Sequence, residues 1–384
     1  MKATYRELKG ETSEVGWGST YFTNIKYLVL LYKGSDKMAN KYWDINKILP
    51  YQRCFNFINA ERSIGKTYTT EKYVVDKCKK LSYEFVYLVR TQDEKKRGIL
   101  QSAFEKVLLK EFPNDEIEFT NEEMILVIRD SEGEVQEKIT LGYCLALSEA
   151  VKIKKRSFPK VKYLIFDEYM LENKQGGQYV NGWKEPDLFL SIYHTIDREE
   201  DRVICFLLGN NTSFFNPYHL HPAFSIPNIK KGKIWVSENV LFQWAISTNE
   251  LKADKAKCKF LRMLDNTSYG RYAKDGDYVD DNYSFIEKMS TTAKYSMTIE
   301  YEGTKFGVYN DMKNGVIYVS DKVDPSCKLI YALTIDDHKE NTLLTKTNSI
   351  SQLKWLSNNF KLGNVRFVSM EVKMKCEKAI ALLL

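Results

Sequence analysis

The fold of this chain is decided by residues 59–67, which read NAERSIGKT. They follow the apolar run Cys54–Ile58 and open a helical-looking segment, Tyr68–Leu81. A strand, a tight loop ending in Gly-Lys-Thr and a helix together form a phosphate-binding loop, the P-loop. In such a loop the backbone N–H groups and the helix N-terminus face the anion, Lys66 reaches the outer phosphates and the Thr67 hydroxyl binds Mg²⁺.

One letter of this stretch departs from the P-loop pattern G-x-x-x-x-G-K-[ST]. Ala60 stands where the pattern has its first glycine, and Arg62 and Ser63 fill a part of the loop that is often richer in glycine. We therefore expect a stiffer entry to the loop, with its phosphate-binding end, Gly65 to Thr67, intact. A motif of this quality is only moderately specific, so the rest of the chain has to support it.

The composition indicates a folded protein of more than one domain. The 384 residues favour two or three domains, and 43% apolar residues supply ample core material. A net charge of +6, from 57 basic and 51 acidic side chains, allows a polyanionic partner without requiring one. The seven cysteines include no C-x-x-C pair and the four histidines form no ligand group, so we expect free thiols and no zinc site.

The sequence contains no segment that would cross a membrane. Its longest apolar runs, residues 27–32 and 379–384, are about six residues long, against the roughly twenty that span a bilayer. The first run also lacks the flanks of a signal peptide. We expect a soluble, intracellular protein.

From about residue 41 to 225 the sequence alternates strand-like and helix-like segments. Short continuous apolar runs are typical of buried parallel strands, and this alternation predicts an α/β domain with a mostly parallel sheet. The strand-like runs are Cys54–Ile58, Glu84–Val89, Glu123–Ile128, Glu137–Leu141, Tyr163–Phe166 and Val203–Leu208, and the helix-like segments are Thr67–Leu81, Lys95–Glu111 and Pro186–Thr195.

The other segments complete a division into four parts. Residues 1–40 are a polar lead-in, which could be an extra strand, a flexible arm or a start site placed too early. Residues 226–285 lose their periodicity, and we expect them to form a small linker domain. Residues 286–384 begin with a three-strand meander, which has Gly303 and Asn314-Gly315 at its turns. A fourth strand and two helices follow.

Two adjacent carboxylates follow the apolar run Tyr163–Phe166, at the edge of the sheet where ligands bind in open α/β folds. Asp167 would hold Mg²⁺, and Glu168 would polarise an attacking water. The alternative is that both residues only cap a helix after a core strand. Their order after Lys66 and Thr67 favours the catalytic interpretation.

The next strand adds two further candidates. It ends in Gly209-Asn210, and a polar side chain at this edge can sense the γ-phosphate, although Asn210 could also be an ordinary turn residue. Arg198, just before this strand, could reach the nucleotide of a neighbouring subunit as an arginine finger. On spacing alone the alternative is favoured, because arginines among acidic residues are usually solvated salt-bridge partners.

Two basic stretches could contact nucleic-acid phosphates without sequence specificity. They are Lys152–Lys162, with six lysines and arginines, and the run Lys95-Lys96-Arg97. For each stretch an ordinary solvated face is an equally good interpretation.

Several motifs in a fixed order resemble those of one family, the DNA-packaging ATPases of phi29-like podoviruses, ring motors that pump genomic DNA into a prohead. The resemblance begins near Met38 and runs to the C-terminus, leaving residues 1–37 outside it. It rests on Asn56-Phe57-Ile58, Arg62 to Thr67, Phe85 to Arg90, Ile165 to Glu168, Asp197-Arg198, Arg202-Val203, Gly209-Asn210, Asn216-Pro217-Tyr218 and Tyr331 to Asp337.

This resemblance implies an ATPase domain of the ASCE P-loop superfamily (41–225), a linker domain (226–285) and a vestigial RNase H-like nuclease domain (286–384). It implies a homomeric ring, commonly of five subunits, that works on double-stranded DNA in the host cytoplasm. The ring would dock on the portal of the prohead through a structural RNA. The implied ligands are ATP and Mg²⁺.

The resemblance also implies a role for each site residue. The ATP-binding loop is Arg62, Ser63, Ile64, Gly65, Lys66 and Thr67, in which Arg62 is the basic loop residue and Lys66 and Thr67 are the Walker-A pair. Asp167 and Glu168 are the Walker-B pair, with Asp167 and Thr67 at the metal. Asn210 matches the sensor and Arg198 the trans-acting arginine finger.

Some positions depart from the family pattern and leave alternatives open. Gln92 stands where relatives have a DNA-contacting lysine. The meander offers only Glu300 as a nuclease carboxylate, and Asp336-Asp337 are expected to cap a helix, so an active nuclease is not expected. The alternatives are a terminase-like motor with an active nuclease and a non-catalytic assembly protein with a degenerate P-loop.

Overall fold

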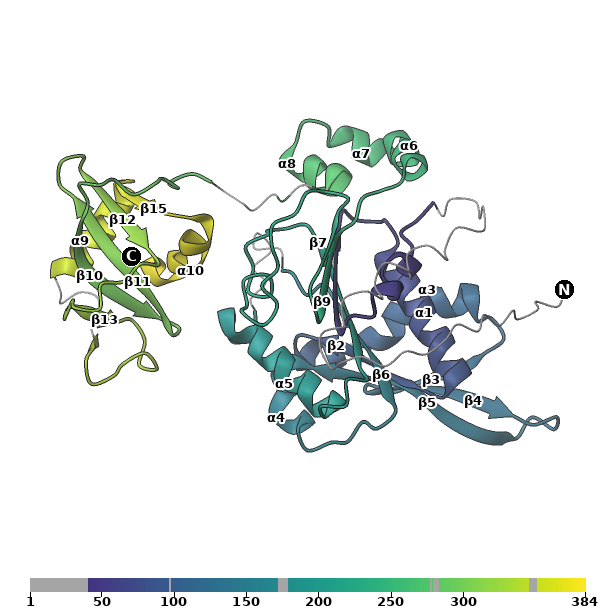
Figure 1. The fold of residues 1–384 in the computed structure, drawn as a ribbon. Helices are drawn as coiled ribbons and strands as arrows, with labels where there is room; N and C mark the ends of the chain where they lie inside the picture. Colours follow the sequence, from purple (N-terminus) through teal and green to yellow (C-terminus); the bar gives the residue numbers. More distant parts are fainter. Residues whose placement is uncertain (1–40, 97, 172–178, 277, 279–282, 345–350) are drawn as a thin grey trace, which may run out of the picture. The chain divides into compact units, whose positions relative to one another are not determined.

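The computed structural model describes residues 41–96, 98–171, 179–276, 278, 283–344 and 351–384, and its first sheet contains nine strands (Figure 1). The strands lie in the order β3-β4-β5-β2-β6-β7-β1-β9-β8. Their bounds are Phe55–Ala60 (β1), Glu84–Val89 (β2), Glu116–Phe119 (β3), Glu123–Arg129 (β4), Val135–Ala146 (β5), Val161–Asp167 (β6), Ile204–Asn210 (β7), Ile234–Val236 (β8) and Val240–Trp244 (β9).

The centre of this sheet is parallel. The pairs β5–β2, β2–β6, β6–β7, β7–β1 and β1–β9 all run in the same direction, while β3, β4 and β8 add antiparallel strands at the two edges. Half of the neighbouring pairs, namely β5–β2, β2–β6, β7–β1 and β1–β9, are not consecutive along the chain, so their connections cross over the sheet. The predicted α/β class with a mostly parallel sheet is confirmed.

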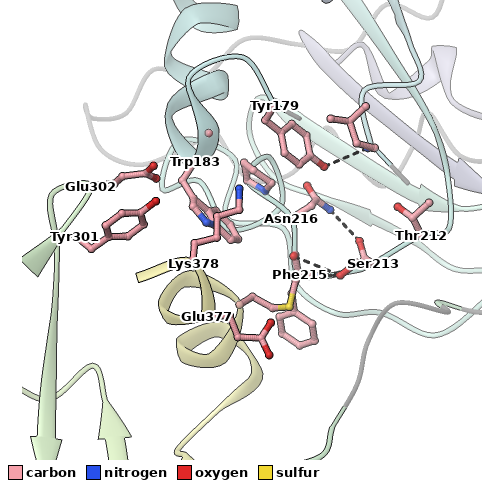
Figure 2. A pocket seen from close by; sticks show the side chains of 14 residues that line it. Tyr179, Trp183, Thr212, Ser213, Phe215, Asn216, Tyr301, Glu302, Glu377 and Lys378 are labelled. Atoms are coloured by element: carbon pink, nitrogen blue, oxygen red, sulfur yellow. Dashed lines mark hydrogen bonds between the residues drawn. The ribbon is translucent and has the colours of Figure 1, made fainter. Parts of the chain in front are cut away.

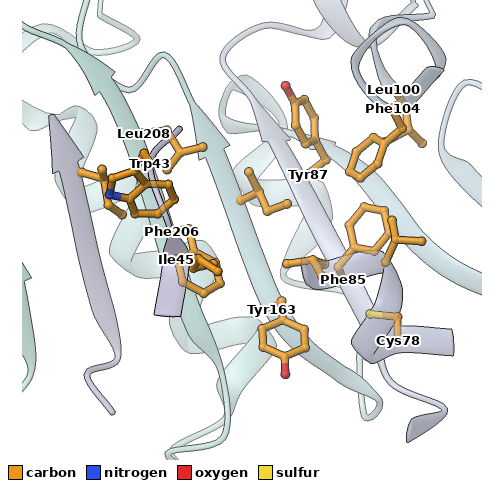
Figure 3. Packing of buried hydrophobic residues seen from close by; sticks show 14 of the residues in the cluster. Trp43, Ile45, Cys78, Phe85, Tyr87, Leu100, Phe104, Tyr163, Phe206 and Leu208 are labelled. Atoms are coloured by element: carbon orange, nitrogen blue, oxygen red, sulfur yellow. The ribbon is translucent and has the colours of Figure 1, made fainter. Parts of the chain in front are cut away.

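Helices pack on both faces of the sheet because its strands are apolar on both sides. In β7, Phe206 and Leu208 join the apolar cluster that includes α1 and α3 residues, part of which Figure 3 shows. Cys205 and Leu207 point the other way, into the cluster that includes α4 and α5 residues. The helical bounds in this part are Ile45–Lys47 (η1), Leu49–Tyr51 (η2), Lys66–Leu81 (α1), Gln92–Lys96 (α2), Ile99–Glu111 (α3), Leu147–Glu149 (η3), Ala150–Ile153 (α4), Gly182–Lys184 (η5) and Glu185–Asp197 (α5).

One predicted helix is wrong as a single element. The segment expected as Lys95–Glu111 is divided into α2 and α3 at Gly98, whose φ of +69° is left-handed and cannot continue a right-handed helix. Helix α2 consists of polar residues only, so the apolar periodicity begins in α3 and does not locate the break.

The sheet extends beyond the boundary expected at residue 225. Strand β9 pairs in parallel with β1 and β8 pairs with β9, so residues 234–244 belong to the first sheet and not to a separate linker domain. Apolar side chains of β9 complete the cores on both faces, which is the physical reason for its place beside β1. The segments after β9 are α6 (Asn249–Lys257), α7 (Lys259–Met263), α8 (Ser268–Gly270) and η6 (Arg271–Asp275).

A second sheet of six strands forms the C-terminal part, in the order β14-β13-β10-β11-β12-β15. The expected meander is present, and left-handed Gly303 and Gly315 lie in its two turns. The two expected helices pack against it in one apolar cluster. The bounds are Lys294–Tyr301 (β10), Thr304–Asp311 (β11), Val316–Ser320 (β12), Ile330–Ala332 (β13), Leu343–Leu344 (β14), Ser351–Lys361 (α9), Val365–Phe367 (β15) and Met370–Ala381 (α10).

The expected helix cap at Asp336-Asp337 is wrong. No helix follows these residues within 338–344, and the Asp337 carboxylate accepts the backbone N–H groups of Glu302 and Gly303 at 2.8 and 2.7 Å. These donors lie in the β10–β11 turn, where the tight hairpin leaves them without a strand partner. Asp337 therefore stabilises a hairpin turn.

Candidate functional site

The loop between β1 and α1 has the geometry of a phosphate-binding loop. Gly65 precedes α1 with a φ of +92°, and a Cβ at this position would lie 3.1 Å from Cβ of Tyr42. Ser63 also has a positive φ, of 63°, and is exposed. Ile64 is buried, and its carbonyl accepts the backbone N–H of Trp43 at 2.8 Å. The loop is therefore tied to the segment before β1, while its turn faces outward.

The position of Ala60 explains why the first P-loop glycine is dispensable here. Ala60 is the last residue of β1, fully buried and paired in parallel register with Asn210 of β7. Its backbone is extended, a conformation that any residue adopts, so no glycine is required. The departure that weakens the sequence motif thus lies in the strand, before the turn begins.

Two hydrogen bonds join the expected site residues across strand ends. Lys66, at the start of α1, donates from Nζ to Oδ1 of Asn210 at 2.9 Å. Thr67 donates from Oγ1 to Oδ2 of Asp167, the last residue of β6, at 2.9 Å. The structure therefore brings together side chains from α1, β6 and β7 at the carboxyl edge of the parallel strands.

Glu168 follows Asp167 in a left-handed conformation, with a φ of 55°. Its backbone N–H donates to Oδ1 of Asp167 at 3.0 Å, so the two carboxylates are held in different orientations. The Glu168 side chain is exposed, whereas that of Asp167 is partly buried. The Glu168 carboxylate is therefore accessible to water at this edge of the sheet.

Burial shifts the charges of this site. It lowers the pKa of the Lys66 ammonium to about 8, with Asp167, Glu61 and Glu168 acting in the opposite direction. It raises the pKa of Asp167, against the effects of Lys66 and the Thr67 hydroxyl. The negative charge of a bound triphosphate would favour the protonated form of Lys66. The positive charge of a bound cation would favour the ionised form of Asp167.

The donor atoms of Thr67 and Asp167 fit a magnesium ion. A hydroxyl and a carboxylate are hard oxygen ligands of the kind that Mg²⁺ prefers. The described residues contain no group of three His, Cys, Asp or Glu side chains that could hold a metal ion without further ligands. Mg²⁺ would therefore bind here through these two residues together with phosphate oxygens and water.

A buried carboxyl group, to which no sequence motif pointed, lies beneath this site. Glu71 lies one turn after Thr67 on α1, is 2% exposed, and has an Oε1 without a hydrogen-bond partner among the described residues. Burial, helped by the charge of Asp167, raises the pKa of Glu71 to about 9, so it is protonated at neutral pH. Its spacing of four residues from Thr67 was the available signal.

A second missed feature is a buried ion pair that supports Glu168. The Arg90 guanidinium lies 3.0 Å from Oε2 of Glu185, and the two side chains are 7% and 0% exposed. Arg90 also donates to the carbonyl oxygens of Glu168 and Tyr169, at 3.0 and 2.6 Å. The pair therefore fixes the backbone of Glu168 and Tyr169. Nothing in the sequence pairs these two residues, which are far apart in the chain.

The loop after β7 is packed by buried polar side chains. Figure 2 shows Asn216, whose Nδ2 donates to the Ser213 carbonyl at 3.1 Å. The Tyr169 hydroxyl lies 2.6 Å from Oδ1 of Asn59 and 2.7 Å from Nε2 of His219. Burial lowers the pKa of His219 to about 3, so it is neutral. This network connects the end of β1, the residue after Glu168 and the loop after Asn210.

Arg198 lies at the opposite edge of the sheet from these residues. Helix α5 begins at Glu185, beside Arg90 at the carboxyl edge, and ends before Arg198 and the start of β7. Thirteen residues of helix span about 20 Å, so Arg198 does not join the site of its own chain. Its side chain is exposed, and within the described part of the chain it forms no ion pair.

One of the basic candidates is engaged inside the protein. Lys95 is 7% exposed, and its Nζ lies 2.7 Å from carboxylate oxygens of both Glu122 and Glu149. A lysine that is buried and paired twice is not available to nucleic-acid phosphates. Arg97 lies outside the described residues.

Three carboxylates of the C-terminal sheet are engaged by neighbouring groups, and the described residues there form no cluster of three possible metal ligands. Glu300 is 1% exposed and accepts Lys339 Nζ at 2.5 Å, while Asp337 stabilises the β10–β11 turn. Asp311 accepts Thr292 Oγ1 at 2.9 Å and Asn314 Nδ2 at 2.7 Å. Each carboxylate is thus engaged with the fold itself.

Comparison with known proteins agrees with this geometry. The family model described as Podovirus DNA encapsidation protein (Gp16) matches residues 36–380. The DNA packaging proteins of Bacillus phages PZA and phi29 are each 30% identical over 333 residues, which are 86% of this chain and 95% of theirs.

Among the described helices, none combines the length and the apolar character that a bilayer-spanning segment needs.

Solved structures show the same relationship. A chain of the bacteriophage phi29 viral genome packaging motor assembly matches with a TM-score of 0.68 and 27% identity. The match covers 90% of this chain and 100% of that chain. The phi28 gp11 DNA packaging motor, at a TM-score of 0.61 and 19% identity, shares the fold. The chain therefore belongs to the Podovirus DNA encapsidation protein (Gp16) family and is a DNA-packaging protein of the phi29 type.

Proposed function

We propose that this chain is an ATP-hydrolysing subunit of a ring motor that packages double-stranded viral DNA into a prohead. The observation that carries the proposal is the pair of hydrogen bonds Lys66–Asn210 and Thr67–Asp167 at the carboxyl edge of the parallel strands. An ammonium, a hydroxyl and a carboxylate that lie together in this way are the groups that a P-loop needs at the outer phosphates of ATP.

Each residue has a role in this proposal. The N–H groups of Arg62 to Lys66 and the N-terminus of α1 surround the phosphates, and the Lys66 ammonium compensates their charge. Thr67 and Asp167 would hold Mg²⁺, which draws electron density from the phosphate oxygens when bound. Lys66 already donates to Asn210, so the amide lies where it can respond to the terminal phosphate.

Glu168 would activate the attacking water. Its carboxylate accepts a proton from this water as the water oxygen bonds to the γ-phosphorus and the bond from that phosphorus to the β–γ bridging oxygen breaks. ADP leaves with the bridging oxygen, and inorganic phosphate leaves with the water oxygen. The Arg90–Glu185 pair, through the carbonyls of Glu168 and Tyr169, keeps the carboxylate in place.

The position of Arg198 supports action between subunits. It is exposed at the sheet edge opposite the P-loop, so it can complete a site only on another copy of the chain. We propose that Arg198 stabilises the charge of the transition state in the site of the neighbouring subunit. Hydrolysis would then depend on assembly of the ring. A ring of five subunits on the portal, attached through a structural RNA and working in the host cytoplasm, is the arrangement the family resemblance implies.

We propose that the C-terminal domain is a vestigial nuclease. The engagement of Glu300 by Lys339 and of Asp337 by a hairpin turn supports this, because a two-metal nuclease needs several convergent carboxylates. Manganese-dependent cleavage of plasmid DNA that is lost in the Asp336→Asn variant would favour the terminase-like alternative instead.

Phosphate release by the purified protein, with and without double-stranded DNA and cognate proheads, tests the main proposal. We expect hydrolysis that both additions stimulate. Failure to bind Mg·ATP in an equilibrium titration would instead support the non-catalytic assembly protein.

A further inference from the structure

The phosphate loop of this chain contains a buried acidic residue. Glu61 is the first residue after β1 and is only 2% exposed. Its negative charge acts on Lys66, raising the pKa of that ammonium against the effect of burial, so the carboxylate lies near the phosphate-binding lysine. A bare carboxylate at this position would repel a triphosphate, and burial makes the repulsion stronger than it would be in water.

The partners of Glu61 come from the segment after β9. The Ser247 backbone N–H donates to Oε1 of Glu61 at 2.9 Å, and Nζ of Lys255, on α6, lies 3.7 Å from the same oxygen. The Lys255 ammonium also donates to the carbonyl of Arg62 at 2.8 Å. One lysine of α6 therefore contacts both the side chain of Glu61 and the backbone of the next loop residue.

Other contacts attach this segment to the same edge of the sheet. The Ala245 N–H donates to the carbonyl of Asn59 at 2.8 Å, and Nδ2 of Asn211 donates to the carbonyl of Gly276 at 2.8 Å. Gly276 packs so closely on Glu61 that a Cβ there would lie 2.9 Å from Oε2. The segment that carries Lys255 thus rests on the phosphate loop and on the residue that follows Asn210.

We propose that Lys255 neutralises Glu61 and that the affinity of the phosphate loop for nucleotide consequently depends on the docking of α6. This inference rests on the proposed function, in which the loop binds ATP. With α6 docked, the ammonium compensates the carboxylate and the loop accepts phosphates. When α6 moves away, the uncompensated Glu61 repels the nucleotide and favours its release.

A cavity beside this pair offers a matched control. It has a volume of about 390 Å³ and is lined by Glu61, Lys255 and other residues, including Lys252. Lys252 is exposed on the same helix, and no contact between it and Glu61 is present among the described interactions. Changing Lys252 removes the same charge from the same cavity without removing the proposed compensation.

The test is equilibrium binding of a non-hydrolysable ATP analogue with Mg²⁺ to the full chain, measured by calorimetry. We expect Lys255→Met to weaken binding roughly tenfold and Lys252→Met to change it by less than about twofold. Lys255→Arg, which keeps the charge, should bind like the unmodified chain. Equal effects of Lys255→Met and Lys252→Met would overturn the proposal.

The decisive comparison uses a chain that already carries Glu61→Gln, whose amide oxygen can still accept the Ser247 N–H. In this background Lys255→Met should leave the affinity unchanged, since no carboxylate remains to be compensated. A roughly tenfold loss there would show that Lys255 acts independently of Glu61, on the phosphates or through the Arg62 carbonyl, and the inference would be wrong. This comparison stands even if the Lys255→Met single variant does not fold, which thermal unfolding would show.

The same titrations separate this inference from the function on which it rests. If the unmodified chain does not bind the analogue, the proposed function fails. If it binds and Lys66→Ala abolishes binding, but Lys255→Met behaves like Lys252→Met, only the role of Lys255 fails.

Discussion

Two pairs of charged groups, one beside each sheet, are compensated in opposite ways. At the carboxyl edge of the nine-stranded sheet, the side chains of Lys66 and Asp167 are hydrogen-bonded to the neutral side chains of Asn210 and Thr67. In the six-stranded sheet, buried Glu300 is paired directly with the ammonium of Lys339. The first arrangement leaves charge to be compensated by a ligand, whereas the second completes its compensation within the fold.

The topology of the two sheets explains this difference. Parallel strands deliver the ends of β1, β6 and β7 to one edge, where loops and a helix N-terminus meet and a ligand can enter. In the meander, turns connect neighbouring strands directly, and carboxylates such as Asp337 are needed to satisfy the backbone donors of those turns. Similar residue types therefore form a binding site in one sheet and structural contacts in the other.

The largest expected effect comes from removing the ammonium of the first sheet. Lys66→Ala should lower ATP hydrolysis at least about a thousandfold, because the charge that compensates the outer phosphates is lost. Steady-state phosphate release measures this. Lys80→Ala, an exposed lysine on the same helix, should behave like the unmodified chain. Hydrolysis that persists in Lys66→Ala would remove the functional contrast between the sheets.

Arg198→Ala tests whether the nine-stranded sheet is completed by another subunit. We expect prohead-dependent hydrolysis to fall about a thousandfold, the lower end of the range for arginine fingers. Mixing the Arg198→Ala and Lys66→Ala chains should restore part of the activity, since one contributes an intact P-loop and the other an intact Arg198. No recovery in mixed assemblies, with both variants shown to assemble, would contradict action between subunits.

Glu168→Gln separates chemistry from binding within the first sheet. Loss of the proton acceptor should lower the rate of hydrolysis by about a hundredfold to a thousandfold while the affinity for Mg·ATP stays nearly the same. Single-turnover kinetics and a nucleotide titration measure the two quantities. A matched change, Glu105→Gln on the exposed face of α3, should affect neither. If affinity falls as much as rate, Glu168 serves in binding and not in water activation.

The smallest expected effect is in the second sheet. Glu300→Gln should leave ATP hydrolysis unchanged and lower the midpoint of thermal unfolding by a few degrees, since it removes a buried partner of Lys339. Calorimetry and phosphate release on the same sample give both values. A loss of hydrolysis without a change in unfolding would show that this carboxylate is functional after all.

Much of the candidate site could be predicted because each part is local in sequence. Apolar runs and the polar residues next to them reveal three parts of the site. These are the strand before the loop, the loop residues Gly65 to Thr67, and the two acidic residues at the end of β6. The structure brings Lys66, Asp167 and Asn210 together as that reasoning expects. Their roles in hydrolysis remain predictions for the experiments above.

Other features were not predictable from local patterns. The division of one expected helix at Gly98 and the pairing of β9 with β1 depend on how distant segments pack. The partner of Arg90, Glu185, lies on another helix and is selected only by the fold. Ala60 looked like a defect of the motif and is harmless, since it belongs to the strand.

The sequence by itself determined the class of fold and predicted a phosphate loop, because apolar periodicity and the order Gly-Lys-Thr are properties of short segments. Only the tertiary structure decided which charges meet. Nothing in the sequence explains the acidic residue Glu61 in the loop. In the structure, the Lys255 ammonium of α6 lies beside its carboxylate. Electrostatic interaction depends on distance in space and burial, and both are set by packing between segments that are remote along the chain.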